Sequence, residues 1–189
     1  KFNELGAEWV QFDEPYLVHD VDDEDIHLFE KLYNGILLVK GNVKVLLQTY
    51  FGDVRDCYKN ICTLAFDGIG LDFIEGRQTK TLLKANGFPK DKLLFAGVVN
   101  GKNIWRNNYK NTLKILNELK TYGIETVIGT SCSLLHVPYT LENEVKLQKK
   151  YRDHFAFALE KLTELTELKV LSETDYTHSK FYINNEKLF

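Results

Sequence analysis

The sequence contains no methionine, only three prolines and only three cysteines among its 189 residues. Because Lys1 is not a translational start, we expect that residues upstream of it have been removed from a longer chain. An odd number of cysteines does not make a disulfide framework. We therefore expect Cys57 and Cys62 to be small buried hydrophobic residues on a helix, in a reducing cytosol.

Other absences restrict what the chain binds. The net charge of -3 and the pI near 6.0 come without the clustered lysines and arginines of a phosphate-binding surface, which excludes nucleic acid as an expected partner. No apolar run approaches the roughly 20 residues of a spanning helix, and no charged-then-apolar leader opens the chain. We expect a soluble, cytoplasmic protein without a membrane partner.

The residues that are present predict an α/β fold, because apolar runs of strand length alternate with amphipathic runs of helix length. A hydrophobic content of 44% suffices for one core, so the chain is one domain or part of one. Strands are expected at Trp9–Phe12, Val43–Tyr50, Gly68–Phe73, Leu93–Val99 and Thr126–Gly129, and helices at Asp22–Tyr33, Val54–Leu64, Thr79–Asn86 and Tyr109–Tyr122.

A long last helix is expected on the outside of the sheet. Its apolar residues recur at helical spacing with charged residues between them, at Phe155, Leu159, Leu162, Leu165 and Leu168. Beyond it, residues 172–189 are polar and aromatic without a clean period. We interpret them as a linker or arm that follows a domain of residues 1–171.

Five parallel strands do not close a (β/α)₈ TIM barrel, which has eight. The alternatives are a doubly wound sheet and a partial barrel, and the absence of a glycine-rich phosphate loop after any strand favours the partial barrel. Its first and last strands would each leave an open edge. Self-association, capping of an edge by the tail after Ser172, or a loosely packed monomer would follow.

Polar side chains stand where the expected strands end, and at the carboxyl ends of parallel strands such groups form pockets. The candidate pocket-lining residues are Asp13, Glu14, Tyr50, Asp72, Asn100, Arg106, Ser131, Cys132 and His136. Alternatively, each of them caps a helix or satisfies loop amides. Lys102 and Arg106 are the candidate anion contacts, unless they form only a basic loop covered by Trp105.

Three chemical readings of these residues are weak. Cys132 lies at no short ligand spacing from a histidine, which argues against zinc. A nucleophilic pair of Cys132 and His136 is also disfavoured, because four residues across a loop do not place the imidazole against the thiol. The acidic run from Asp20 to Asp25 lacks the glycine and the distal glutamate of a calcium loop. We expect no catalytic and no metal-binding residues.

Five segments resemble the amino-terminal barrel of the cobalamin-independent methionine synthase family, in order and spacing across residues 1–171. They are Trp9–Pro15, Thr49–Gly52, Gly70–Phe73, Gly97–Arg106 and Ser131–Pro138 together with Leu141–Glu144. The resemblance implies two facing barrels, of which the carboxyl-terminal one holds zinc, homocysteine and the chemistry. The amino-terminal barrel would be a non-catalytic partner that helps to hold the folate, and this chain its strands four to eight.

The resemblance also implies an activity for the whole protein: transfer of a methyl group from 5-methyltetrahydropteroyl-triglutamate to homocysteine without cobalamin. The related catalytic barrel is expected to hold zinc through histidine, cysteine, glutamate and a second cysteine. The corresponding places here carry Tyr50, Gly52, Asp72 and Cys132, so at most two ligands of four remain. The chain alone is expected to lack both zinc and turnover.

Two other functions remain open. The chain could be a binding module for folate or a small anion, built on the strand ends. It could also be an enzyme of the uroporphyrinogen decarboxylase-like barrels, although these would need several arginines as a carboxylate clamp and the chain has only four.

Overall fold

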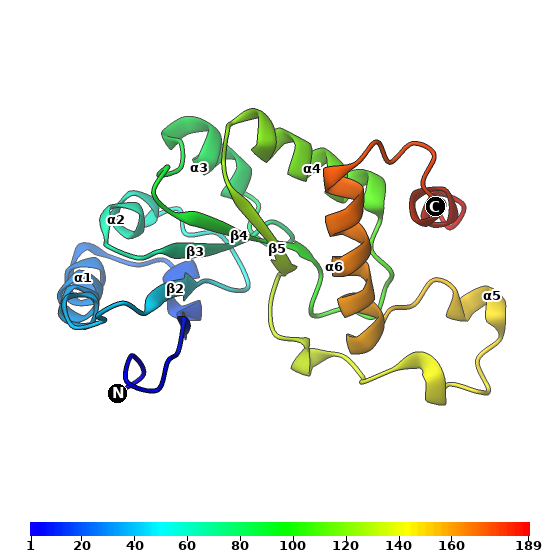
Figure 1. The fold of residues 1–189 in the computed structure, drawn as a ribbon, viewed down its shortest axis with the longest axis horizontal. Helices are drawn as coiled ribbons and strands as arrows, with labels where there is room; N and C mark the ends of the chain where they lie inside the picture. Colours follow the sequence, from blue (N-terminus) through cyan, green and yellow to red (C-terminus); the bar gives the residue numbers. More distant parts are fainter. The chain divides into compact units, whose positions relative to one another are not determined.

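The computed structural model describes all residues from 1 to 189. Strands and helices alternate along most of the chain, as the sequence predicts (Figure 1). The elements are β1 (Trp9–Asp13), η1 (Pro15–Val18), α1 (Asp23–Leu38), β2 (Lys44–Gln48), α2 (Tyr58–Thr63), β3 (Gly68–Asp72), α3 (Thr79–Asn86), β4 (Leu93–Val99), α4 (Tyr109–Thr121), β5 (Thr126–Thr130), η2 (Leu134–His136), η3 (Leu141–Asn143), α5 (Lys149–Arg152), α6 (Ala158–Glu173) and α7 (Lys180–Glu186).

The five strands form one parallel sheet in the order β1-β2-β3-β4-β5, which is their order in the sequence. The register of the first pair runs from Trp9 opposite Lys44 to Asp13 opposite Gln48. An α/β fold with a parallel sheet and crossover helices is thus confirmed, and it is consistent with a partial barrel. The assignment of these strands as four to eight of a barrel stays a prediction.

The chain divides into two compact units. Unit 1 contains residues 1–96 and 124–127, and unit 2 contains residues 97–123 and 128–189. The predicted division into a domain of residues 1–171 and a linker or arm of residues 172–189 is a different one, and it stays a prediction.

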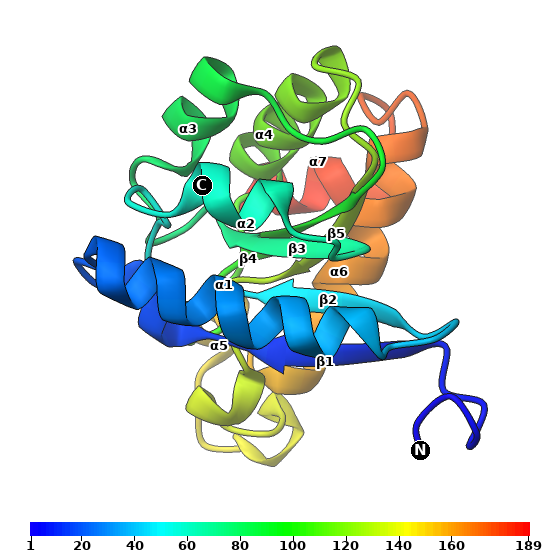
Figure 2. The ribbon, with the colours of Figure 1, turned by 90° about the vertical axis from the view of Figure 1, so that its left-hand side faces the viewer.

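Unit 1 is built on aromatic packing between α1 and the sheet. The side chain of Asp22 caps α1 by accepting from the amides of Glu24 and Asp25. The ring of Tyr33 on α1 packs edge-on against Phe12 of β1 at a centroid distance of 5.7 Å. Figure 2 shows α1 lying along β1 and β2. These contacts hold the carboxyl end of β1 against its covering helix.

Unit 2 is built on α4, α6 and α7, which pack against one another. The side chain of Asn108 caps α4, and Gly123, with a φ of 69°, follows its end as the sequence predicts. The buried Asn185 of α7 accepts from the amide of Tyr109 at 2.9 Å and donates to the carbonyl of Asn107 at 2.8 Å. The tail therefore ends in a helix and adds no strand to the sheet.

Several boundaries differ from the predicted ones. Helix α1 continues beyond Tyr33 to Leu38, because Leu37 extends the buried spacing of Phe29 and Tyr33. Helix α2 is limited to six residues. Helix α6 begins at Ala158, three residues after the predicted Phe155.

The buried face of α6 also differs from the predicted apolar one. It carries Lys161, Glu164, Leu168 and Leu171, whereas Leu162 is 49% exposed. Periodicity alone could not separate two leucine-bearing faces of one helix. No helix of the chain combines the length and the apolarity that crossing a membrane requires.

Candidate functional site

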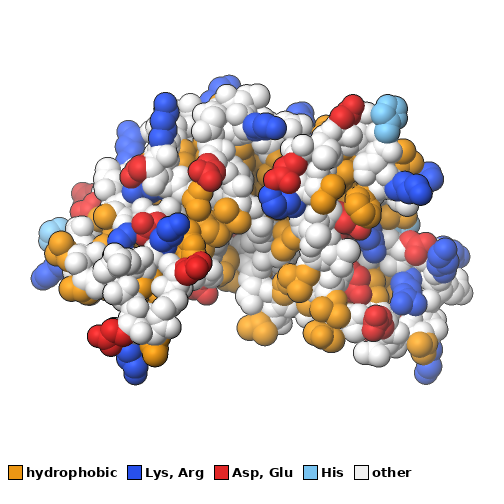
Figure 3. Space-filling view, in the orientation of Figure 1, with side chains coloured by type: hydrophobic (Ala, Val, Ile, Leu, Met, Phe, Trp, Pro, Cys, Tyr) orange, Lys and Arg blue, Asp and Glu red, His pale blue; other side chains and the backbone are white.

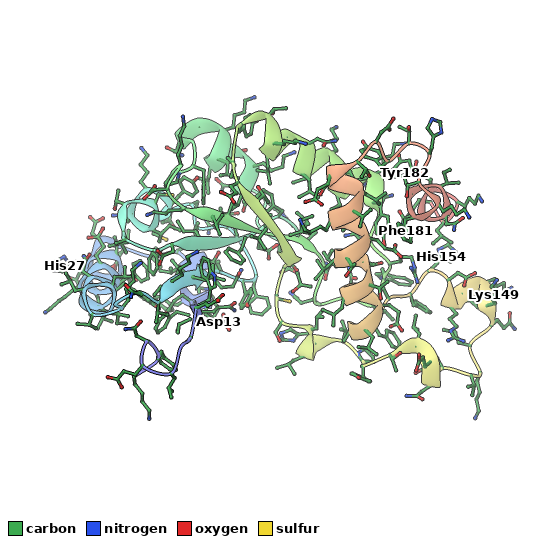
Figure 4. All side chains as sticks on the ribbon, in the orientation of Figure 1. Asp13, His27, Lys149, His154, Phe181 and Tyr182 are labelled. Carbon is green, nitrogen blue, oxygen red and sulfur yellow. The ribbon has the colours of Figure 1, made fainter.

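At the carboxyl ends of β1 and β2 in unit 1, three side chains form a polar group. The amide nitrogen of Gln11 donates to a carboxylate oxygen of Asp13 at 2.6 Å and to the hydroxyl of Tyr50 at 3.0 Å. Asp13, labelled in Figure 4, and Gln11 are exposed, so the group faces solvent. Asp13 and Tyr50 were predicted, and Gln11 was missed because it precedes the strand end by two residues and shares its face.

Glu14 has a structural partner within unit 1. Its carboxylate accepts a hydrogen bond of 2.5 Å from the hydroxyl of Tyr33 on α1. Burial, followed by this bond to Glu14, raises the pKa of Tyr33. The predicted pocket residue Glu14 therefore ties the end of β1 to α1.

Asp72 is buried at the end of β3 and holds the loop that follows. One of its oxygens accepts from the amides of Ile74 at 2.7 Å and Glu75 at 3.0 Å. Burial raises the pKa of Asp72, while the amide bonds to Glu75 and Ile74 oppose the rise. The alternative reading, in which a strand-end carboxylate satisfies loop amides, describes these contacts.

In unit 2, Asn100 and Ser131 organise the turn after β4. The side-chain oxygen of Asn100 accepts from the amides of Lys102 at 2.8 Å and Asn103 at 2.9 Å. The hydroxyl oxygen of Ser131 accepts from the amide of Gly101 at 3.2 Å. Both side chains thus fix backbone at the carboxyl ends of β4 and β5.

Cys132 and His136 differ in exposure. The thiol of Cys132 is buried and donates to the carbonyl of Ser133 at 3.7 Å, and a side chain at Gly101 would collide with the Cys132 backbone. His136 lies at the end of η2 and is exposed. A buried thiol of this kind is a poor nucleophile.

Arg106 binds backbone rather than lying free. Its Nε donates to the carbonyl of Asp153 at 3.0 Å and its Nη2 to that of Phe155 at 3.4 Å. The ring of the neighbouring Trp105 packs against that of Phe155 at a centroid distance of 5.0 Å and an interplanar angle of 34°, and Trp105 is 56% exposed. The segment that contains both residues is therefore fixed at Arg106, while Trp105 remains exposed to solvent.

Two buried charges on α6 were missed by sequence reasoning. Lys161 donates to the carbonyl of Trp105 at 3.1 Å, and one oxygen of Glu164 accepts from the amide of Asn107 at 2.8 Å. The second oxygen of Glu164 is buried without a hydrogen-bond partner. Burial raises the pKa of Glu164 to about 6 and lowers the pKa of Lys161. Only their spacing of three residues on one face could have signalled the pair.

The resemblance implies a zinc site in the related barrel, and the corresponding residues of this chain differ from it in their donor atoms. No group of three or more histidine, cysteine, aspartate or glutamate side chains is placed to hold a metal ion. The residues in the corresponding places offer the phenol of Tyr50, no side chain at Gly52, the amide-bound carboxylate of Asp72 and the buried thiol of Cys132. These residues do not fit a zinc site.

The structure thus gives most predicted residues definite local roles within their own units. It brings Asp13 together with Tyr50, and Asn100 together with Ser131 through Gly101. Whether all nine candidates line one pocket stays a prediction.

Comparisons with known proteins agree with one another. The family described as cobalamin-independent synthase, N-terminal domain, matches residues 1–123. A 5-methyltetrahydropteroyltriglutamate–homocysteine methyltransferase of Lactococcus lactis subsp. cremoris (strain SK11) is 58% identical over 168 residues, 89% of this chain and 22% of the relative. A protein of the same name from Campylobacter jejuni (strain 81-176) is 50% identical over 186 residues, 98% of this chain and 25% of the relative. The chain spans about a quarter of the length of these relatives.

Proposed function

The chain belongs to the cobalamin-independent synthase family, matching its N-terminal domain, and from this membership we propose that it serves a methyltransferase that makes methionine. The whole protein would transfer a methyl group from 5-methyltetrahydropteroyl-triglutamate to homocysteine. The carrying observation is the identity of 58% and 50% to relatives that bear that name. The proposed place of action is the cytoplasm, where the three free cysteines would stay reduced.

We propose that these 189 residues have no turnover of their own. In the whole protein, the remaining sequence would supply zinc ligands and the homocysteine site. The strand ends of this chain would not supply zinc ligands, because Asp72 binds loop amides and Cys132 is buried. The role of this part would be to position a substrate or the catalytic half.

Activity measurements test both parts of this proposal. The purified chain, given zinc, homocysteine and the triglutamate methyl donor, should form no methionine. The full-length Lactococcus lactis relative should form it under the same conditions. A chimaera in which these residues replace the matching 22% of that relative should retain activity. Turnover by the isolated chain would refute its proposed inactivity. A chimaera that folds but forms no methionine would refute the proposed role of these residues in the methyltransferase.

A binding module is the second candidate, and the group of Gln11, Asp13 and Tyr50 favours it. An exposed carboxylate beside an amide and a phenol offers both acceptors and donors, as a pteridine ring requires. Calorimetric titration with folate triglutamate should show binding that Asp13→Asn weakens about ten-fold, the effect of losing one charged hydrogen-bond partner. A titration that releases or absorbs no heat of binding would rule out the binding module.

The uroporphyrinogen decarboxylase-like alternative receives no support from the arginines. Arg55 pairs with Asp20 and Asp53, at 2.6 and 3.1 Å. Arg106 is bound to backbone carbonyls. Arg55 is thus already paired with two carboxylates, and Arg106 alone does not make a clamp of several arginines.

Unit 1 carries an apolar groove that another part of the longer protein could cover. The groove has a volume of about 270 Å³ and is lined chiefly by Val10 and Phe12 of β1 and by Ile36 and Val39 at the end of α1. Strand β1 is also an edge of the sheet. We propose that the remainder of the longer chain covers this groove, because the relatives are about four times as long as this chain.

In the isolated chain the uncovered groove should cause self-association. Leu28 and Leu32 on α1 are more than half exposed, and hydrophobic side chains are visible over α1 at the left of Figure 3. Light scattering should show oligomers that Ile36→Lys disperses, while Leu135→Lys, at an exposed position of η2 in unit 2, should not. A monomer at all concentrations would contradict the self-association.

A further inference from the structure

Residues 104–107 of unit 2 form an irregular segment after β4 that is held from α6 by two buried side chains. Lys161 donates to the carbonyl of Trp105, and Glu164 accepts from the amide of Asn107. Two helix side chains thus satisfy one acceptor and one donor of the segment, which lie two residues apart. Such bonds replace the ladder that an irregular segment lacks.

The same segment is paired with the stretch that leads into α6. Trp105 and Phe155 form an antiparallel bridge, with backbone bonds of 2.8 Å and 2.9 Å on either side of it. The guanidinium of Arg106 donates to two carbonyls of the same stretch. The position of the Trp105 indole is therefore preorganised.

This arrangement costs stability. Lys161 and Glu164 are 0% and 1% exposed, and one oxygen of Glu164 lacks a partner. Burying polar groups incompletely paired is unfavourable, and proteins often retain such costs where function requires a fixed geometry. What the geometry fixes here is Trp105, a residue that remains more than half exposed.

The indole forms one wall of a cavity of about 350 Å³, a size that suits a small ligand. Tyr151, which is 52% exposed, lies on another wall. The lining residues are Trp105, Arg106, Tyr151, His154, Phe155 and Phe189. Four of these six side chains are aromatic, which favours a flat ring.

The charge of the lining selects the substituent on that ring. It contains a guanidinium and an imidazole but no acidic side chain. Helix α5 adds Lys149, Lys150 and Arg152 nearby, and Figure 4 shows His154 and Lys149 on this side of unit 2. We propose that the cavity binds a small planar aromatic carboxylate, its ring stacked on Trp105 and its charge at Arg106 and His154. This site is independent of the proposed function.

Titration calorimetry with 2-naphthoate tests the site, with 2-naphthylmethylammonium as the probe of equal ring and opposite charge. We expect one equivalent of 2-naphthoate to bind with a Kd of about 1 mM or below, as suits a ligand of its size. The ammonium probe should bind at least about ten-fold more weakly. A chain extended beyond Phe189 should bind the carboxylate no more weakly, because its own terminal carboxylate is moved away.

Two variants locate the site. Trp105→Ala and Tyr151→Ala should each weaken 2-naphthoate binding about ten-fold, the loss of one aromatic wall. Tyr139→Ala, which removes a 70% exposed ring of unit 2 outside the cavity, is the matched control and should leave the affinity unchanged. Circular dichroism of each variant verifies its fold.

Three results would overturn the proposal. The first is the absence of heat up to about 10 mM probe, far above the Kd expected for a built site. The second is equal affinity for the two probes, which would show hydrophobic adsorption without charge selection. The third is unchanged binding in folded Trp105→Ala, which would place the ligand elsewhere.

Discussion

Removing the charge of Glu164 should mainly change how the free energy of unfolding depends on pH. Burial raises the pKa of this carboxyl from an ordinary 4.5 to about 6 in the folded protein. The groups that face it are Lys161 and Glu167 on α6 and Arg106 and Asn107 on the segment after β4. Glu164→Gln keeps the shape and the acceptor for the Asn107 amide, and removes the titration.

The sign follows from which state binds the proton more tightly. Because the folded pKa is the higher one, the folded state keeps the proton over a range in which the unfolded state has lost it. The contribution to stability is complete below about pH 4.5 and is lost as the pH rises through about 6. A shift of about 1.5 pKa units corresponds to about 2 kcal/mol in the free energy of unfolding.

Urea unfolding of the wild-type chain and Glu164→Gln at several pH values between about 4 and 7.5 measures this contribution. The variant should gain about 2 kcal/mol relative to wild type from the acidic to the neutral end of this range. The buried amide of the variant adds a cost that does not depend on pH, so it cancels in this comparison. Glu144→Gln, at an exposed position of unit 2, serves as the control.

A difference between wild type and variant that is independent of pH would refute the reasoning. It would mean that Glu164 is hydrated or paired in solution, so that folding does not shift its pKa. A relative gain toward acidic pH would reverse the sign and would place a dominant positive charge beside the carboxylate.

Three further predictions concern packing and the strand ends. Gly76→Ala places a methyl group 2.2 Å from the backbone carbonyl oxygen of Asp72 and should cost about 1–3 kcal/mol in urea unfolding; an unchanged midpoint would contradict the close approach. Asp72→Ala leaves two partly buried loop amides without their acceptor and should cost about 1–3 kcal/mol, whereas Asp72→Asn should recover part of the loss. Burial raises the pKa of Cys57 to about 12, so Cys57 and Cys132 should resist an aromatic disulfide reagent until urea is added; rapid native labelling of either would show that its thiol is exposed.

Much of the fold could be predicted because its signals are local. Apolar runs bounded by polar turns placed all five strands, and Leu93–Val99 and Thr79–Asn86 have the predicted bounds. Gly123 was expected to end its helix and does so with a positive φ, which a residue without a Cβ adopts at little cost. The family resemblance, which rests on contiguous motifs, was confirmed by the comparisons.

The candidate site was less predictable, because polar strand ends have two uses that look alike in a sequence. Asp72 and Asn100 were named as pocket residues, and the structure shows both of them binding loop amides. Glu14 likewise binds a tyrosine that lies 19 positions away. No spacing rule connects such residues, since the partner is brought near by packing of the helix on the sheet.

The sequence by itself determined the alternation of strands and helices, the helix caps and the family, because neighbouring residues carry those signals. The tertiary structure alone decided which face of α6 is buried. The leucines of that helix lie on more than one face, and the apolar period cannot rank those faces. Contact with the segment after β4 selects the face that carries Lys161 and Glu164, because these two side chains satisfy a carbonyl and an amide of its backbone, which leucines could not do.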